Sequence, residues 1–97
     1  MATIVSMRFA SNKTQEELDD LSNAGLEKFR SLPHLGQKYY VKNEQTGQVG
    51  GIYVFHTRQA AEDYAHGPIV ASVRERYGIE GELTLEILDV LMTLSES

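Results

Sequence analysis

The sequence predicts one α+β domain with the element order β-α-β-β-α-β and helices on one face of an antiparallel sheet. Residues 2–9 alternate between apolar and polar positions, as a half-buried strand does. Helical spacing of apolar residues follows at 14–30 and returns at 58–77, with strand-like runs between and after these segments. No repeat, linker or low-complexity stretch interrupts the chain, so we expect a single domain over 1–97.

The first half of the chain contains a strand, a capped helix and a second strand. One face of the first strand carries Thr3, Val5, Met7 and Phe9, and the other carries Ile4, Ser6 and Arg8. Thr14 and Glu17 have the spacing of a capping box, which predicts a helix from Thr14 to about Arg30. Pro33 ends this helix, and the second strand is expected over residues 37–42.

A third strand is predicted at Val49–Phe55, after a polar hairpin turn at 43–48. This strand is mostly apolar on both faces, which predicts a central place in the sheet. The adjacent Gly50 and Gly51 indicate either a bulge or the close approach of another group.

The second helical unit is expected in two pieces. Thr57 is a suitable cap for a short helix over 58–65, and Gly67 followed by Pro68 ends that helix. Pro68 then begins a second helix, which ends at Gly78.

The final strand is predicted over Leu83–Leu94 and is apolar on both faces. At about twelve residues it is longer than the usual strand of about five or six. In a sheet with helices on one side only, the second apolar face needs a cover. We therefore expect a homodimer in which two ferredoxin-like sheets pack face to face, which is the architecture of a dimeric α+β barrel.

The charged residues exclude one class of partner. Nine Lys and Arg stand against fourteen Asp and Glu, a net charge of −5. Residues 1–78 carry nine of each sign, so the deficit lies in the last nineteen residues, which contain neither Lys nor Arg. An acidic domain without a basic face is poorly suited to bind a phosphate backbone, so no nucleic-acid partner is expected.

The absence of cysteine excludes disulfides, thiolate zinc sites and iron–sulfur clusters. The first apolar run lacks a preceding basic segment and is interrupted by Arg8, so we expect no signal peptide. No apolar stretch approaches the roughly 20 residues of a membrane helix. The expected location is the cytoplasm, without membrane association.

The junction between the third strand and the next helix carries a family resemblance. The strand Gly50-Gly51-Ile52-Tyr53-Val54-Phe55 ends on an aromatic residue, and a Thr cap and a helix with Ala and Tyr follow it as Thr57, Ala60 and Tyr64. This pattern resembles the small mono-oxygenases related to YdhR, within the antibiotic-biosynthesis mono-oxygenase superfamily, and the resemblance spans essentially the whole chain. It implies a dimeric α+β barrel with one small pocket per subunit, either between sheet and helices or inside the barrel.

The resemblance also implies an activity. Enzymes of this superfamily oxidise electron-rich aromatics, such as polyketide quinol precursors, with O₂ and without metal or flavin. We therefore expect a cofactor-independent mono-oxygenase for a small aromatic or polyketide-like substrate, with no cofactor and no metal. The alternative is a non-catalytic dimeric module that binds a small hydrophobic ligand, for example in a stress response. No catalytic residue is assigned.

Two tyrosines and two arginines are the candidate substrate-binding residues. Tyr53 and Tyr64 are expected to face the interior, where each is either a packed core aromatic or a wall of the pocket. Arg8 is expected inside the barrel, where it either pairs with Glu86 or Asp89 or orients a substrate anion.

Arg74 is the fourth candidate. It lies ten residues beyond Tyr64, and by the resemblance this position corresponds to the proximal histidine of the haem-degrading members. Because arginine does not ligate iron, the resemblance argues against haem degradation. Arg74 either anchors an acidic or enolate oxygen, or is a solvated arginine paired with Glu75 or Asp63. His66 is interpreted as a helix cap rather than a metal ligand.

Overall fold

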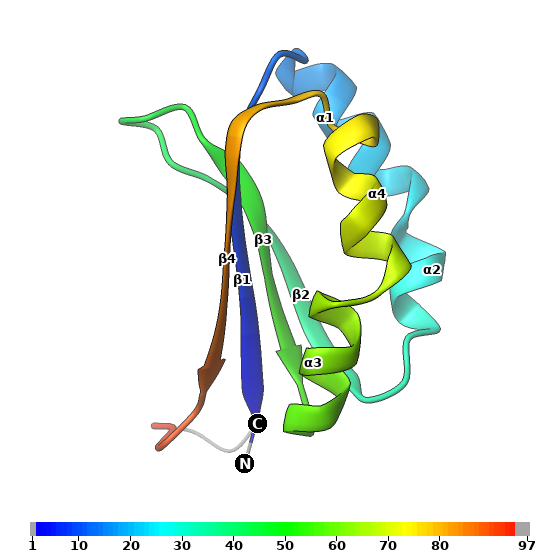
Figure 1. The fold of residues 1–97 in the computed structure, drawn as a ribbon, viewed down its shortest axis with the longest axis vertical. Helices are drawn as coiled ribbons and strands as arrows, with labels where there is room; N and C mark the ends of the chain where they lie inside the picture. Colours follow the sequence, from blue (N-terminus) through cyan, green and yellow to red (C-terminus); the bar gives the residue numbers. More distant parts are fainter. Residues whose placement is uncertain (1, 95–97) are drawn as a thin grey trace.

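The computed structural model describes residues 2–94, which form an antiparallel four-stranded sheet covered by helices on one face (Figure 1). The elements are β1 (Thr3–Ser11), α1 (Gln15–Ala24), α2 (Leu26–Arg30), β2 (Leu35–Lys42), β3 (Val49–Phe55), α3 (Arg58–Ala65), α4 (Pro68–Arg76) and β4 (Ile79–Asp89). The strand order β2-β3-β1-β4 confirms the predicted ferredoxin-like α+β fold. Among these helices none is long and apolar enough to cross a membrane.

The first predicted helix is capped as expected but is divided in two. The Glu17 backbone N–H donates to Thr14 Oγ1 at 3.2 Å, and the Thr14 N–H donates to Glu17 Oε1 at 2.9 Å, which completes the capping box. Gly25 separates α1 from α2, because a residue without a side chain is a poor helix former and its N–H bonds the Asn23 carbonyl instead. The short α2 then buries Phe29 against the sheet.

The glycine pair in β3 marks a close approach, not a bulge. The register of β1 with β3 runs without interruption from Thr3–Phe55 to Phe9–Val49. A side chain on Gly51 would meet the Tyr53 ring, whose hydroxyl oxygen lies 2.5 Å from the Cβ position. The Tyr53 ring therefore lies over Gly51, in space that only a glycine leaves free.

The core lies between the inner face of the sheet and the helices. Its members from the sheet are Val5, Met7, Phe9, Val49, Tyr53 and Phe55, and those from the helices are Leu18, Phe29, Ala61, Tyr64, Val70 and Val73. These side chains occupy alternate strand positions and helical stripes, which is the periodicity that predicted them.

The last strand begins and ends earlier than predicted. β4 covers Ile79–Asp89, not Leu83–Leu94, and it pairs with β1 from Ser11 opposite Ile79 to Thr3 opposite Asp89. β4 ends opposite Thr3, the first residue of β1, and just beyond it the Val90 N–H donates to the Ala2 carbonyl at 2.9 Å. The apolar side chains of Leu91, Met92 and Leu94 follow the strand and are exposed.

The pairing of Arg8 with Asp89 is a prediction that the structure contradicts. Asp89 faces the helices, where it accepts a hydrogen bond from Thr3 Oγ1 at 3.2 Å and forms an ion pair with Arg58 at 2.6 Å. Arg8 points to the opposite face of β1, because it lies five positions after Thr3 and side chains alternate along a strand. Within residues 2–94 Arg8 forms no ion pair with Glu86 either.

The face of the sheet away from the helices is uncovered in the single chain (Figure 1). Strand pairing places Ile4, Ile52 and Leu88 together on this outer face. Tyr39, which is 53% exposed, lies beside Ile52 on the edge strand. Three aliphatic side chains and a tyrosine on one surface are unusual for a sheet face that contacts only water, so this face is suited to pack against another surface.

We expect Gly51→Ala to lower the free energy of unfolding by about 1–3 kcal/mol, because the new methyl group collides with the buried Tyr53 ring. Gly25→Ala is the matched control, since a Cβ there meets its nearest atom at 3.5 Å, an ordinary contact. The control should leave the free energy of unfolding unchanged or raise it by up to about 1 kcal/mol in urea denaturation, because Ala fits the helical backbone at this position. Equal stability of the two variants would contradict the assigned approach of Tyr53 to Gly51.

Candidate functional site

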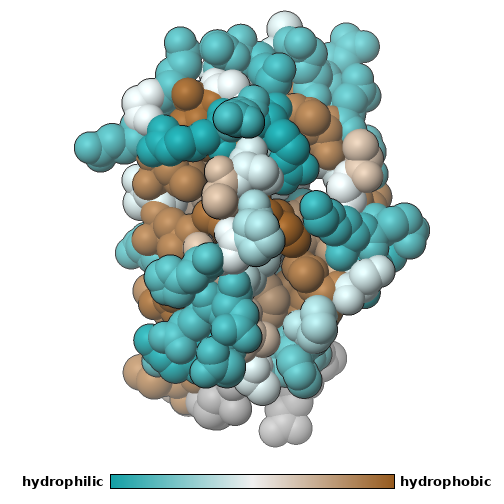
Figure 2. Space-filling model, turned by 45° about the vertical axis from the view of Figure 1, so that its right-hand side comes forward, coloured by the Kyte–Doolittle hydropathy of each residue, from teal (hydrophilic) through white to brown (hydrophobic). Residues whose placement is uncertain are grey.

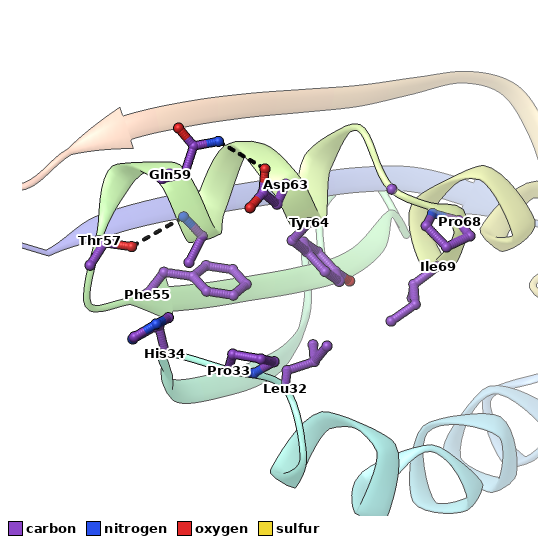
Figure 3. A pocket seen from close by; sticks show the side chains of 12 residues that line it. Leu32, Pro33, His34, Phe55, Thr57, Gln59, Asp63, Tyr64, Pro68 and Ile69 are labelled. Carbon is purple, nitrogen blue, oxygen red and sulfur yellow. Dashed lines mark hydrogen bonds between the residues drawn. The ribbon is translucent and has the colours of Figure 1, made fainter.

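A pocket of about 400 Å³ opens where the connection between α2 and β2 meets the end of β3 and the start of α3 and α4 (Figure 3). We call it the apolar pocket. Its lining residues are Leu32, Pro33, His34, Phe55, Thr57, Gln59, Ala60, Asp63, Tyr64, Gly67, Pro68 and Ile69. On the helix side of the molecule, apolar surface shows between the polar side chains (Figure 2). The volume and the mostly apolar lining suit a small organic ligand.

Local backbone interactions hold the walls of the apolar pocket. The Ala60 N–H donates to Thr57 Oγ1 at 3.1 Å, which caps α3 as predicted and fixes its first turn beside Phe55 (Figure 3). Across the pocket, the His56 N–H donates to the His34 carbonyl at 2.8 Å. His34 has a positive φ of 64°, and this turn brings the α2–β2 connection back against the end of β3.

Tyr64 of α3 forms the inner wall of the pocket. Its ring centroid lies 4.9 Å from that of Tyr53 and 5.5 Å from that of Phe55, and Phe29 packs edge-on at 6.2 Å. The Tyr64 hydroxyl is buried and has no hydrogen-bond partner within the described residues. Burial raises the pKa of Tyr64 far above its ordinary value, so the phenol stays protonated.

A second, smaller cavity of about 20 Å³ shares Tyr64 with the apolar pocket and is here called the inner cavity. It is lined by Met7, Phe9, Phe29, Lys38, Tyr40, Gly50, Gly51, Tyr53, Tyr64, Val73, Arg76 and Tyr77. Two of these residues are cationic. Burial and then the charge of Arg76 lower the pKa of Lys38, whose Nζ lies 3.8 Å from the centroid of the Phe29 ring.

Lys38 and Tyr40 also border a third hollow, between α1 and the edge strand β2. This edge hollow has a volume of about 330 Å³ and includes Asp19 of α1. The inner cavity therefore shares Lys38 and Tyr40 of β2 with the edge hollow, and it shares Tyr64 with the apolar pocket. Burial raises the pKa of Tyr40, whose hydroxyl has no partner in the described part of the chain.

The structure brings two of the four predicted site residues together. Tyr53 and Tyr64 are each 6% exposed and pack against one another, and both line the inner cavity. Arg8 lies on the far face of the sheet, and Arg74 is exposed on α4, where its Nη1 donates to the Gly81 carbonyl at 3.1 Å. Neither arginine reaches the pocket, and among residues 2–94 Arg74 pairs with neither Glu75 nor Asp63.

Sequence reasoning missed the two cations that do face the interior. Lys38 lies opposite Tyr53 across the strands and shares its inner face, as Tyr40 does opposite Gly51. A charged residue at an inward strand position was the available signal. The sequence signal for Arg76 was weaker. Arg74, Glu75 and Arg76 follow one another in α4, and such a run of charges is typical of a solvated helix face.

The histidines do not form a metal centre in residues 2–94, where no three His, Asp or Glu side chains are grouped to hold an ion. His66 is the C-terminal cap of α3, as predicted, and its N–H bonds the Glu62 and Tyr64 carbonyls. His34 lines the apolar pocket, where it is one of few ionisable groups together with Asp63.

Comparison with known proteins places the chain in a family. The family model described as "Putative mono-oxygenase ydhR" matches residues 4–97. No match is found among curated protein sequences. The fold is shared with several solved structures.

Three of these structures illustrate the shared fold. SnoaB, a cofactor-independent oxygenase from Streptomyces nogalater, is 12% identical with a TM-score of 0.73, over 98% of each chain. A monooxygenase from the gene ActVA-Orf6 of Streptomyces coelicolor, in complex with the ligand Nanaomycin D, is 18% identical with a TM-score of 0.74, over 99% of this chain and 93% of that one. A dimeric ferredoxin-like protein of unknown function from Jannaschia sp. CCS1 is 15% identical with a TM-score of 0.63, over 91% of this chain and 99% of that one.

The buried tyrosines make a prediction about alkaline titration. Burial raises the pKa of Tyr40, Tyr53 and Tyr64 in the fold, so stability is lost as the pH rises above about 10, where the unfolded phenols ionise. In the native protein Tyr64→Phe should leave the tyrosinate absorbance titration unchanged. In urea, where the chain is unfolded, the variant should show four fifths of the wild-type absorbance change, because one of the five tyrosines is gone. A smaller native amplitude for the variant, at a pH where the wild type is folded, would show that Tyr64 is accessible.

Proposed function

Since the chain belongs to the family described as "Putative mono-oxygenase ydhR", we propose that it is a cofactor-independent mono-oxygenase for a small aromatic or polyketide-like substrate. The observation that carries the proposal is the apolar pocket of about 400 Å³ with its aromatic walls. Ligand pockets of small molecules are mostly apolar and contain a few polar groups that fix orientation, as this one does.

The proposed reaction needs no electron donor other than the substrate. One oxygen atom of O₂ enters the substrate, and the other leaves as water with two hydrogens taken from it, so that an activated R₂CH₂ and O₂ give R₂C=O and H₂O. The substrate supplies the two pairs of electrons that reduce O₂, which requires an electron-rich aromatic that ionises easily. The protein contributes a water-poor site and a fixed orientation of the substrate.

The side chains of the pocket divide these tasks. Phe55 and Tyr64 form an aromatic wall against which a planar substrate can stack (Figure 3). His34 and Asp63 are ionisable groups of the pocket and are within reach of a polar substituent. Tyr53 and Tyr64 remain proposed substrate contacts, whereas Arg8 and Arg74 are not included because they lie away from the pocket.

A homodimer is part of the proposal. The outer face of the sheet carries exposed apolar side chains, and the Jannaschia protein of the same fold is described as dimeric. Packing the outer faces of two copies together would cover Ile4, Ile52 and Leu88 and close the dimeric α+β barrel. Arg8 and Glu86 share this face, so an ion pair between subunits is open to them.

The second candidate is a non-catalytic module that binds a small hydrophobic ligand. The mostly apolar lining of the pocket favours it, because such a lining is all that binding requires. The two candidates differ in one measurement. A mono-oxygenase consumes O₂ in proportion to the product formed, whereas the binding module releases its ligand unchanged.

Filling the apolar pocket should remove activity. Ala60 of α3 lines the pocket, and Ala60→Phe would occupy part of its volume. With a carboxylated anthrone as substrate and ¹⁸O₂, we expect the wild type to place one labelled atom in the ketone product, and Ala60→Phe to lower kcat/KM by about tenfold or more. The matched control is Ala71→Phe on the exposed side of α4, which should keep the activity. Equal activity of both variants would exclude this pocket as the substrate site.

Charge on the outer face should dissociate the dimer. Leu88 is 47% exposed on the outer face, and Leu26, at 41%, is exposed on α2 of the helix layer. We expect Leu88→Lys to weaken dimerisation by about tenfold or more in analytical ultracentrifugation, because a charge is buried without a partner. Leu26→Lys should leave the dimer intact. A monomeric wild type, or a dimer broken only by Leu26→Lys, would contradict the proposed interface.

A further inference from the structure

Two cations of the inner cavity lack an anionic partner. Lys38 reaches the cavity from β2 and Arg76 reaches it from the last turn of α4. The salt bridges among residues 2–94 join Arg30 to Glu27 and Arg58 to Glu62 and Asp89, so neither cavity cation is paired. Two like charges close enough for one to lower the pKa of the other are unfavourable unless an anion joins them.

The cavity also contains hydrogen-bond donors without acceptors. Arg76 Nε and the hydroxyls of Tyr40 and Tyr64 are buried without a hydrogen bond of normal geometry in the described part of the chain, although Gln15 lies near the Tyr40 hydroxyl and the Tyr53 hydroxyl lies near that of Tyr64. All three groups border the same cavity. Buried donors are almost always paired in folded proteins, so a cluster of free ones indicates a ligand that supplies the acceptor.

The size of the cavity limits what can bind there. A volume of about 20 Å³ accommodates one water-sized group, since a single water needs at least about 10–15 Å³ by the same measure. One oxygen atom of a larger molecule has this size. In the adjoining edge hollow, the Asp19 carboxylate accepts a hydrogen bond from Gln15 at 2.7 Å and not from Lys38.

We propose that the inner cavity binds an ionised oxygen of the substrate between Lys38 and Arg76, so that the substrates of this protein are aromatic acids. This inference rests on the proposed function, because it assigns the ring of the same substrate to the apolar pocket. The two cations would hold the carboxylate by charge-assisted hydrogen bonds and so fix the orientation of the ring in the apolar pocket.

Tyr64 separates the ring position from the oxygen position. It is held by ring packing against Tyr53, Phe55 and Phe29, and no hydrogen bond within the described residues fixes its hydroxyl. When the oxygen occupies the inner cavity, the free Tyr64 hydroxyl has an acceptor to which it can donate.

The experiment compares an aromatic acid with its neutral amide. 2-Naphthoate and 2-naphthamide have the same ring and nearly the same shape, and they differ in charge. By calorimetric titration near neutral pH, we expect the wild type to bind the acid at least about tenfold more tightly than the amide, as charge-assisted hydrogen bonds require. Arg76→Met and Lys38→Met should each reduce this preference to about threefold or less.

Arg74→Met is the matched control. It removes the same charge two residues away on α4 but leaves the inner cavity unchanged. The preference for the acid should survive in this variant, and Arg76→Lys, which retains the charge and serves if Arg76→Met does not fold, should keep most of it. Equal binding of acid and amide by the wild type, no binding of the acid, or an equal loss in Arg74→Met would each overturn the proposal.

The outcome can be separated from that of the proposed function. If the protein prefers 2-naphthoate through Lys38 and Arg76 but consumes no O₂ with any aromatic acid, the anion site stands and the mono-oxygenase proposal fails. If O₂ consumption occurs with neutral aromatics as readily as with acids, the mono-oxygenase stands and the anion site is overturned.

Discussion

The packing of Tyr64 on α3 against Tyr53 and Phe55 of β3 is the contact on which the rest of this structure depends. It sets the distance of the helix layer from the sheet, and ring centroids 4.9 and 5.5 Å apart leave no space between those elements at that point. Space is therefore left on either side of Tyr64, as the apolar pocket and the inner cavity. Gly51 belongs to the same arrangement, because only a glycine there admits the Tyr53 ring.

This packing has a cost in buried polar groups. A core that buried only rings would be more stable than one that also buries the hydroxyls of Tyr40 and Tyr64 and part of Arg76 without partners among the described residues. Lys38 adds a desolvated cation, which its packing over the Phe29 ring offsets in part. Sites that depart from the rules of stable folding in this way are commonly those that bind or react.

The same topology determines what the other sheet face can do. All helices of the described chain lie on one side of the sheet, so Ile4, Ile52 and Leu88 on the outer face contact either solvent or another subunit. Arg8 shares this outer face and can interact only with groups on that side of the sheet. The two faces therefore have separate tasks in the proposed dimer. The inner face binds the ligand and the outer face joins the subunits.

The sequence by itself determined the order of the elements, their caps and their buried faces, because these depend on near neighbours in the chain. Thr14 and Thr57 cap their helices through near neighbours in the chain, and the alternation in β1 reports burial directly. The bounds of the last strand depend on its partner, since β4 pairs with β1 from Ile79 opposite Ser11 to Asp89 opposite Thr3. The site was likewise decided by tertiary structure. Arg8, Lys38, Arg74 and Arg76 are alike as isolated charges, and only strand register and helix rotation place Lys38 and Arg76 in one cavity while leaving Arg8 and Arg74 outside it.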